Sequence, residues 1–90
     1  MNKTLVIQKY GGTSVGILDR IRNVAQRISR IRKTGTHVVV VVSAMAGQTD
    51  KLVKMAGEIC QNPEKREMDL LLSSGERISS ALLTMALHSL

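Results

Sequence analysis

Residues 9–16 read Lys-Tyr-Gly-Gly-Thr-Ser-Val-Gly, and this stretch joins a short apolar run to an amphipathic one. The run before it, residues 4–8, is rich in branched side chains and predicts a β-strand that ends at the glycines. Gly11, Gly12 and Gly16 leave the backbone uncovered, so an anion can approach its N–H groups closely. A helix that follows would point its free N–H groups and positive dipole end at the same place. The stretch therefore predicts a phosphate-binding turn.

The spacing of apolar residues after the turn predicts a helix. They recur every three or four positions, the period of one helical face, at Ile17, Ile21, Val24, Ile28 and Ile31. Gly35 is a plausible helix stop just beyond Lys33. We expect a helix over 17–33.

Five consecutive valines, Val38–Val42, predict a second strand. A strand without polar alternation is typical of a parallel sheet that is covered on both faces. Ser43–Asp50 is small and polar and is expected to be a loop, with Thr49 or Asp50 capping a helix that runs roughly to Cys60. This lone cysteine fits a small buried side chain in a reducing compartment.

The C-terminal third is expected to be helical with interruptions. Pro63 fits the first position of another short helix, and Leu70–Leu72 lead into Ser73–Glu76. Beyond these residues, Ile78–Ala86 predicts a final amphipathic helix. The order strand, helix, strand, helix, helix implies a right-handed crossover and an α/β layered fold.

Two strands do not bury both faces of a parallel sheet, and the last helix reaches Leu90 without a stop signal. So little sheet in ninety residues would leave large apolar faces exposed to water. We therefore expect residues 1–90 to be the N-terminal part of a larger domain, with no internal domain boundary.

Composition and motif spacing argue against several classes of protein. The net charge is +6, but Tyr10 is the only aromatic residue, so there is no stacking platform for single-stranded nucleic acid. No apolar run approaches the ~20 residues of a membrane span, and Met1–Gln8 lacks a secretory h-region, which favours a cytoplasmic protein without membrane contact. The Walker A and G-x-G-x-x-G patterns are absent, and no cluster has metal-ligand spacing, so no metal site made by side chains is expected.

Three blocks of the chain resemble the aspartokinases, a group within the amino acid kinase family. They are Ile7–Val15, then Val38–Met45 with Gln48–Asp50, and finally Met68–Glu76. The blocks follow in order and the resemblance spans essentially the whole chain. The loop at Gln48–Asp50 and the residues Arg66–Asp69 look closer to the monofunctional, end-product-regulated type.

This resemblance implies an α/β three-layer sandwich, of which the chain supplies the first strands and helices. It implies ATP-dependent phosphorylation of the L-aspartate side-chain carboxylate to 4-phospho-L-aspartate, the first step toward lysine, threonine and methionine. ATP and Mg²⁺ would be the cofactors, and the full-length enzyme is expected to be a homo-oligomer. The later catalytic aspartate and the nucleotide-base pocket would lie beyond Leu90, so the isolated fragment is expected to be inactive.

The same resemblance assigns roles in the glycine turn. Lys9 would be the catalytic residue that stabilises charge on the transferring phosphoryl group. Gly11 and Gly12 would offer backbone N–H groups to the phosphates of ATP, with Tyr10 in the same loop. These roles suit phosphoryl transfer, which depends on positioning and on charge neutralisation.

The aspartate site would draw on the second and third blocks. Ser43, Ala44 and Thr49 match substrate-contacting positions, and Glu76 matches a glutamate that receives the substrate amino group. Ser43 follows a strand, where α/β folds place ligand groups, and Glu76 is expected near a helix start, where the dipole favours a carboxylate.

Three alternatives remain open at the level of the sequence. One is another kinase of the family, acting on glutamate, N-acetylglutamate or carbamate. Another is a truncated copy without catalytic function, and the third is a basic nucleic-acid-binding module.

Overall fold

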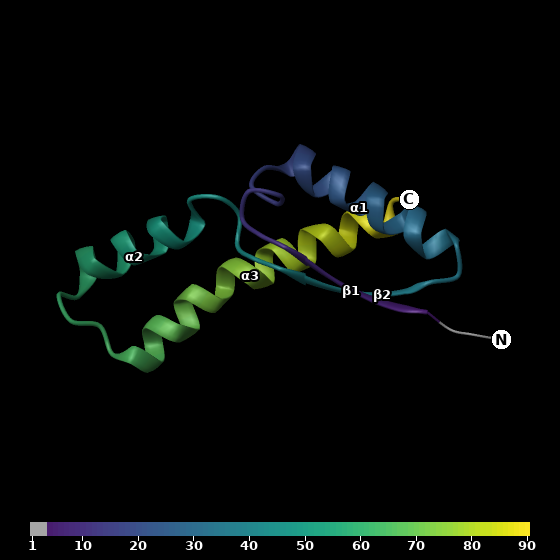
Figure 1. The fold of residues 1–90 in the computed structure, drawn as a ribbon. Helices are drawn as coiled ribbons and strands as arrows, with labels where there is room; N and C mark the ends of the chain where they lie inside the picture. The colour runs from purple at the N-terminus through teal and green to yellow at the C-terminus, as the bar shows by residue number, and fades with distance from the viewer. Residues whose placement is uncertain (1–3) are drawn as a thin grey trace.

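The computed structural model describes residues 4–90, which form two strands and three helices (Figure 1). In chain order they are β1 (Leu5–Tyr10), α1 (Leu18–Lys33), β2 (His37–Val42), α2 (Gln48–Ile59) and α3 (Lys65–His88). The strands pair in parallel, from Leu5 opposite His37 to Tyr10 opposite Val42, and α1 connects them. The predicted α/β class and element order are confirmed.

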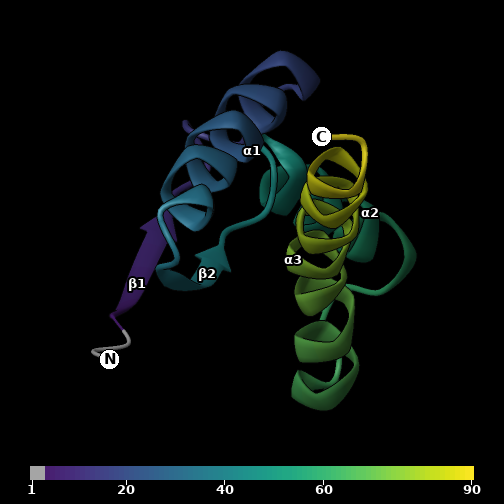
Figure 2. The same cartoon turned by 90° about the vertical axis from the view of Figure 1, so that its right-hand side faces the viewer.

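The core lies on one face of the sheet, beneath α1 and the C-terminal part of α3 (Figure 2). It consists of buried residues from the strands, the glycine turn and the two helices: Tyr10, Val15, Ile21, Val24, Ala25, Ile28, Val42 and Leu83. Three positions of the predicted helical stripe are buried here, whereas Ile17 precedes the helix and is exposed. The 3.6-residue periodicity therefore identified the buried face of α1 correctly.

The opposite face of the sheet is open along both strands. Leu5 and Ile7 of β1 and Val39 and Val41 of β2 expose about half or more of their surface, and Ile7 exposes 70%. The prediction that both faces of the valine strand are covered is thus wrong for residues 4–90 taken by themselves. The expectation that so short a chain leaves an apolar face in water is confirmed.

The loop after β2 is shorter than predicted. Helix α2 begins at Gln48, and its N-cap is Gly47 in the left-handed conformation, with φ of 76°. Thr49 and Asp50 therefore lie inside the first helical turn and cap nothing. Cys60 follows the end of α2 and is exposed, so its predicted burial is wrong.

The C-terminal third forms one continuous helix where interruptions were expected. Helix α3 begins at Lys65, two residues after Pro63, and runs through Ser73–Glu76 without a break. The hydroxyls of Ser73 and Ser74 donate to the carbonyls three residues earlier, at 2.9 and 2.6 Å, so the serines do not compete with the helix. Glu76 consequently lies in the middle of a helix, and its predicted place near a helix start is wrong.

Within residues 4–90, no helix combines the length and apolar character needed to cross a bilayer.

Candidate functional site

The glycine turn leaves β1 as a tight, well-anchored bend. The N–H groups of Ser14 and Val15 both donate to the carbonyl of Gly11, at 3.0 and 3.3 Å, and the Val15 side chain is fully buried. None of the backbone hydrogen bonds found among residues 4–90 uses the N–H of Gly12 or Thr13. These two donors at the end of a strand are available to an anion.

Gly11 differs from the other glycines of the turn in having open space beside it. A Cβ added there would meet no atom of residues 4–90 within 4 Å, and the residue does not have a positive φ. Neither packing nor backbone conformation of this part of the chain requires glycine at that position. Close approach of a ligand to the main chain is a remaining reason for its presence.

Lys9 and Tyr10 point to opposite faces of the sheet, because side chains alternate along a strand. Lys9 is exposed on the open face, and no acidic group among residues 4–90 forms an ion pair with it. Tyr10 is buried on the core face, where its hydroxyl donates to Gln8 Oε1 at 2.6 Å. Tyr10 is also the last residue of β1, so its predicted place in a loop is wrong.

The second block meets the glycine turn at the carboxyl end of β2. The N–H of Ser43 donates to the carbonyl of Tyr10 at 3.0 Å, which aligns the two chain segments. Ala44 is buried beside them, and Thr49 is exposed in the first turn of α2. The structure therefore places Ser43 and Ala44 against the turn, with Thr49 further along the chain.

The third block reaches the same place through α3. Gly75 is buried against Ala44 and the side chain of Gln48. The adjacent residue, Glu76, is exposed on the helix surface. The three predicted blocks, which are distant in sequence, are thus adjacent in the fold.

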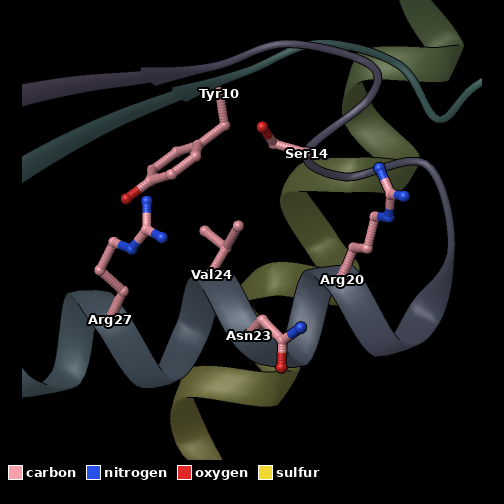
Figure 3. A pocket seen from close by; sticks show the side chains of 6 residues that line it. All are labelled: Tyr10, Ser14, Arg20, Asn23, Val24 and Arg27. Carbon is pink, nitrogen blue, oxygen red and sulfur yellow. The ribbon is translucent and has the colours of Figure 1, made fainter.

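A cavity of about 170 Å³ behind the glycine turn was not predicted from the sequence (Figure 3). Residues from the turn, from β1 and from one side of α1 line it: Tyr10, Ser14, Arg20, Asn23, Val24 and Arg27. Arg20 Nη1 donates to the carbonyl of Thr13 at 2.7 Å and so ties the helix to the turn. The spacing of Arg20, Asn23 and Arg27 by three and four residues was the available signal, and these two arginines add positive charge near the turn.

No three His, Cys, Asp or Glu side chains come together as a possible metal site in the part of the chain that the structure describes.

The α/β fold and the glycine turn agree with the family to which sequence comparison assigns the chain. The family model described as "Amino acid kinase family" matches residues 4–90, and the chain belongs to this family. Among curated proteins it is similar to the aspartokinase of Helicobacter pylori strain J99, with 58% identity over 84 residues, and to that of Mycobacterium tuberculosis strain H37Rv, with 56% over 86. These alignments cover 93% and 96% of the chain.

A solved structure agrees with these relatives. The aspartate kinase from Synechocystis matches with a TM-score of 0.93 and 56% identity, over 96% of this chain and 15% of that one. The resemblance to aspartokinases is confirmed. The chain spans about a fifth of the length of the curated relatives that it matches.

Proposed function

We propose that residues 1–90 form the N-terminal part of an aspartate kinase catalytic domain. The complete domain transfers a phosphoryl group from ATP to the side-chain carboxylate of L-aspartate and yields 4-phospho-L-aspartate. The observation that carries this proposal is the turn at the end of β1, with the unpaired N–H groups of Gly12 and Thr13 within residues 4–90 and the exposed cation of Lys9. The names of the relatives supply the acceptor, aspartate.

The glycine turn would hold the phosphates. Backbone N–H groups of Gly11 and Gly12 donate to phosphate oxygens, and Lys9 balances the charge that develops during transfer. Tyr10 contributes through its main chain, since its ring is buried on the core face. ATP supplies the phosphoryl group, and Mg²⁺ bound to its phosphates would neutralise part of their charge.

The aspartate would lie beside the turn. Ser43 and Ala44 follow β2 at its carboxyl end, and Thr49 and Glu76 complete the set from α2 and α3. Glu76 would accept hydrogen bonds from the substrate's amino group as an exposed carboxylate. The enzyme would act in the cytoplasm as a homo-oligomer, without nucleic-acid or membrane partners.

A chimera tests this function directly. Residues 4–90 replace the matched segment of the Helicobacter pylori aspartokinase, and phosphorylation is followed as aspartyl-hydroxamate formation. We expect the chimera to phosphorylate aspartate in preference to glutamate or N-acetylglutamate. The chain 1–90 alone should form no hydroxamate. A folded chimera without activity would favour a non-catalytic copy, as would a reading frame that ends at Leu90.

Within the chimera, Lys9→Ala should lower kcat by about 10²–10³-fold, the usual effect of removing one preorganised charge contact. Lys33→Ala is the matched control, because Lys33 lies at the far end of α1 and is equally a surface lysine. Equal activity of the two variants would contradict the role of Lys9.

A further inference from the structure

Glycines and alanines from three separate segments pack closely where the predicted blocks meet. We call Gly12, Gly16, Ala44, Ala46 and Gly75 the small-residue junction. A Cβ added to Gly16 would lie 3.0 Å from the Gly12 carbonyl oxygen and 3.1 Å from Ala46 Cβ, and one added to Gly12 would lie 3.3 Å from the Ala44 carbonyl oxygen. The glycine turn and the loop after β2 therefore pack so closely that a side chain at Gly12 or Gly16 would force a shift of one of them.

Gly75 is the most tightly packed member of this junction. A Cβ added to it would lie 2.8 Å from Ala44 Cβ and 3.5 Å from Gln48 Cγ. Carbon atoms in ordinary contact are about 3.5–4.0 Å apart, so a methyl group here would push the two segments apart by about 1 Å. Glycine is normally unfavourable within a helix, and this contact explains why α3 has one at its centre.

Helix α3 is held firmly on the C-terminal side of Gly75. Ser79 is fully buried and donates to the Gly75 carbonyl at 3.3 Å, and Leu83, one turn further, belongs to the core. The Ser79 hydrogen bond lies within the helix, whereas the packing of Leu83 in the core holds α3 against the sheet and α1. A methyl group at position 75 would therefore displace mainly the loop that carries Ser43 and Ala44.

We propose that Gly75 is a positioning residue that sets the distance between Glu76 and Ser43, the two sides of the aspartate site. Gly75 touches Ala44, and each is the chain neighbour of one of those residues. The absence of a side chain lets α3 approach the loop closely enough for both groups to reach one substrate. This inference rests on the proposed function and adds the residue that fixes its geometry.

The test compares Gly75→Ala with Gly57→Ala in the chimera. Both replace a glycine in a helix, but a Cβ on Gly57 would meet nothing within 4 Å among residues 4–90. We expect Gly75→Ala to lower kcat/KM for aspartate by about a hundredfold, the effect of a 1 Å misplacement, mostly through a higher KM for aspartate. The KM for ATP should change much less. Gly57→Ala should have the same kcat and the same KM for aspartate as the parent chimera.

A compensating change separates positioning from general damage. Ala44→Gly removes the methyl group that the new Cβ would strike. Because Ala44 is itself assigned to the aspartate site, the reference is Ala44→Gly alone, and adding Gly75→Ala to it should lower kcat/KM at least about tenfold less than adding Gly75→Ala to the parent. If Gly75→Ala does not fold, the double variant should fold and be active. An equal loss in both backgrounds would overturn the inference.

Two outcomes distinguish this inference from the proposed function. An active parent chimera in which Gly75→Ala matches Gly57→Ala in KM for aspartate overturns the positioning role and leaves the kinase function standing. A folded parent chimera without activity overturns the kinase function, and the positioning role with it.

Discussion

Two regions of the chain have similar amphipathic helices but differ in how much apolar surface they bury. The sheet region comprises β1, the glycine turn, α1, β2 and α3 from Gly75 onward, and it contains the whole core cluster. The arm comprises α2 and α3 before Gly75, and it extends away from the sheet (Figure 1). In α2 only Leu52 is buried, whereas Val53, Met55 and Ile59 are exposed.

This difference shows that an amphipathic sequence pattern predicts a helix but not how much of its apolar face is buried. Helix α1 packs against both the sheet and α3, so its stripe is enclosed. Among the helices and strands of residues 4–90, helix α2 packs against α3 alone, and one helix covers only part of its apolar surface. The small-residue junction lies where the two regions meet.

The largest effect on stability is expected in the sheet region. Ile21 is 2% exposed in the core, and Ile21→Ala should reduce the free energy of unfolding by about 3 kcal/mol through lost contacts and a cavity. Urea denaturation measures the change. Ile59→Ala in the arm is the control, since Ile59 is 89% exposed. Similar losses in both variants would mean that the two regions do not differ as described.

A smaller effect is expected for the one buried residue of α2. Leu52→Ala should reduce the stability of the packing between α2 and α3 by about 2 kcal/mol. The loss is smaller than for Ile21 because the two helices can partly close around the missing atoms. The loss should be local, with faster amide hydrogen exchange in α2 and in α3 before Gly75. Protection in β1, β2 and α1 should remain at the parent level. Loss of protection throughout would show that the arm and the sheet region unfold as one unit.

The smallest effect has the opposite sign. Gly57→Ala should stabilise the chain by about 0.5–1 kcal/mol, because alanine favours the helix and the added methyl group meets nothing among residues 4–90. The melting temperature should rise slightly. A fall would show that α2 has a neighbour in solution at that point.

The sequence was sufficient to predict the helix and the strand whose patterns lie within one short stretch of the chain. The isoleucine spacing predicted α1 because side-chain periodicity reflects backbone geometry directly. The unbroken valine run predicted β2 because such runs are typical of strands in parallel sheets. The prediction of element boundaries failed where a residue type that often interrupts or caps a helix makes a different contact in the structure. Ser73 and Ser74 suggested a break, but their hydroxyls bond to the preceding turn of α3. Gly47, and not Thr49, precedes the first turn of α2 as its N-cap.

The candidate site could be predicted as a set of residues but not as an arrangement. Motif resemblance singled out Lys9, Ser43 and Glu76 without showing that their segments meet. Strand pairing brings Ser43 to the end of β1 beside Lys9, and the contact between Gly75 and Ala44, which are far apart in sequence, brings the segment of Glu76 to the same loop. The cavity beside Arg27 was missed for the same reason, because β1 and the turn complete it.

The burial of Tyr10 has a consequence for the orientation of Lys9. A slip of β1 by one residue against β2 would exchange the two faces of the strand. Tyr10 would then leave the core, and the ammonium group of Lys9 would face the apolar core instead. Burying that charge without a partner would cost a large amount of folding free energy. The free energy of folding therefore selects the register in which the lysine faces outward. The burial of Tyr10 thus fixes the register of β1, and with it the orientation of Lys9 toward the open face of the sheet.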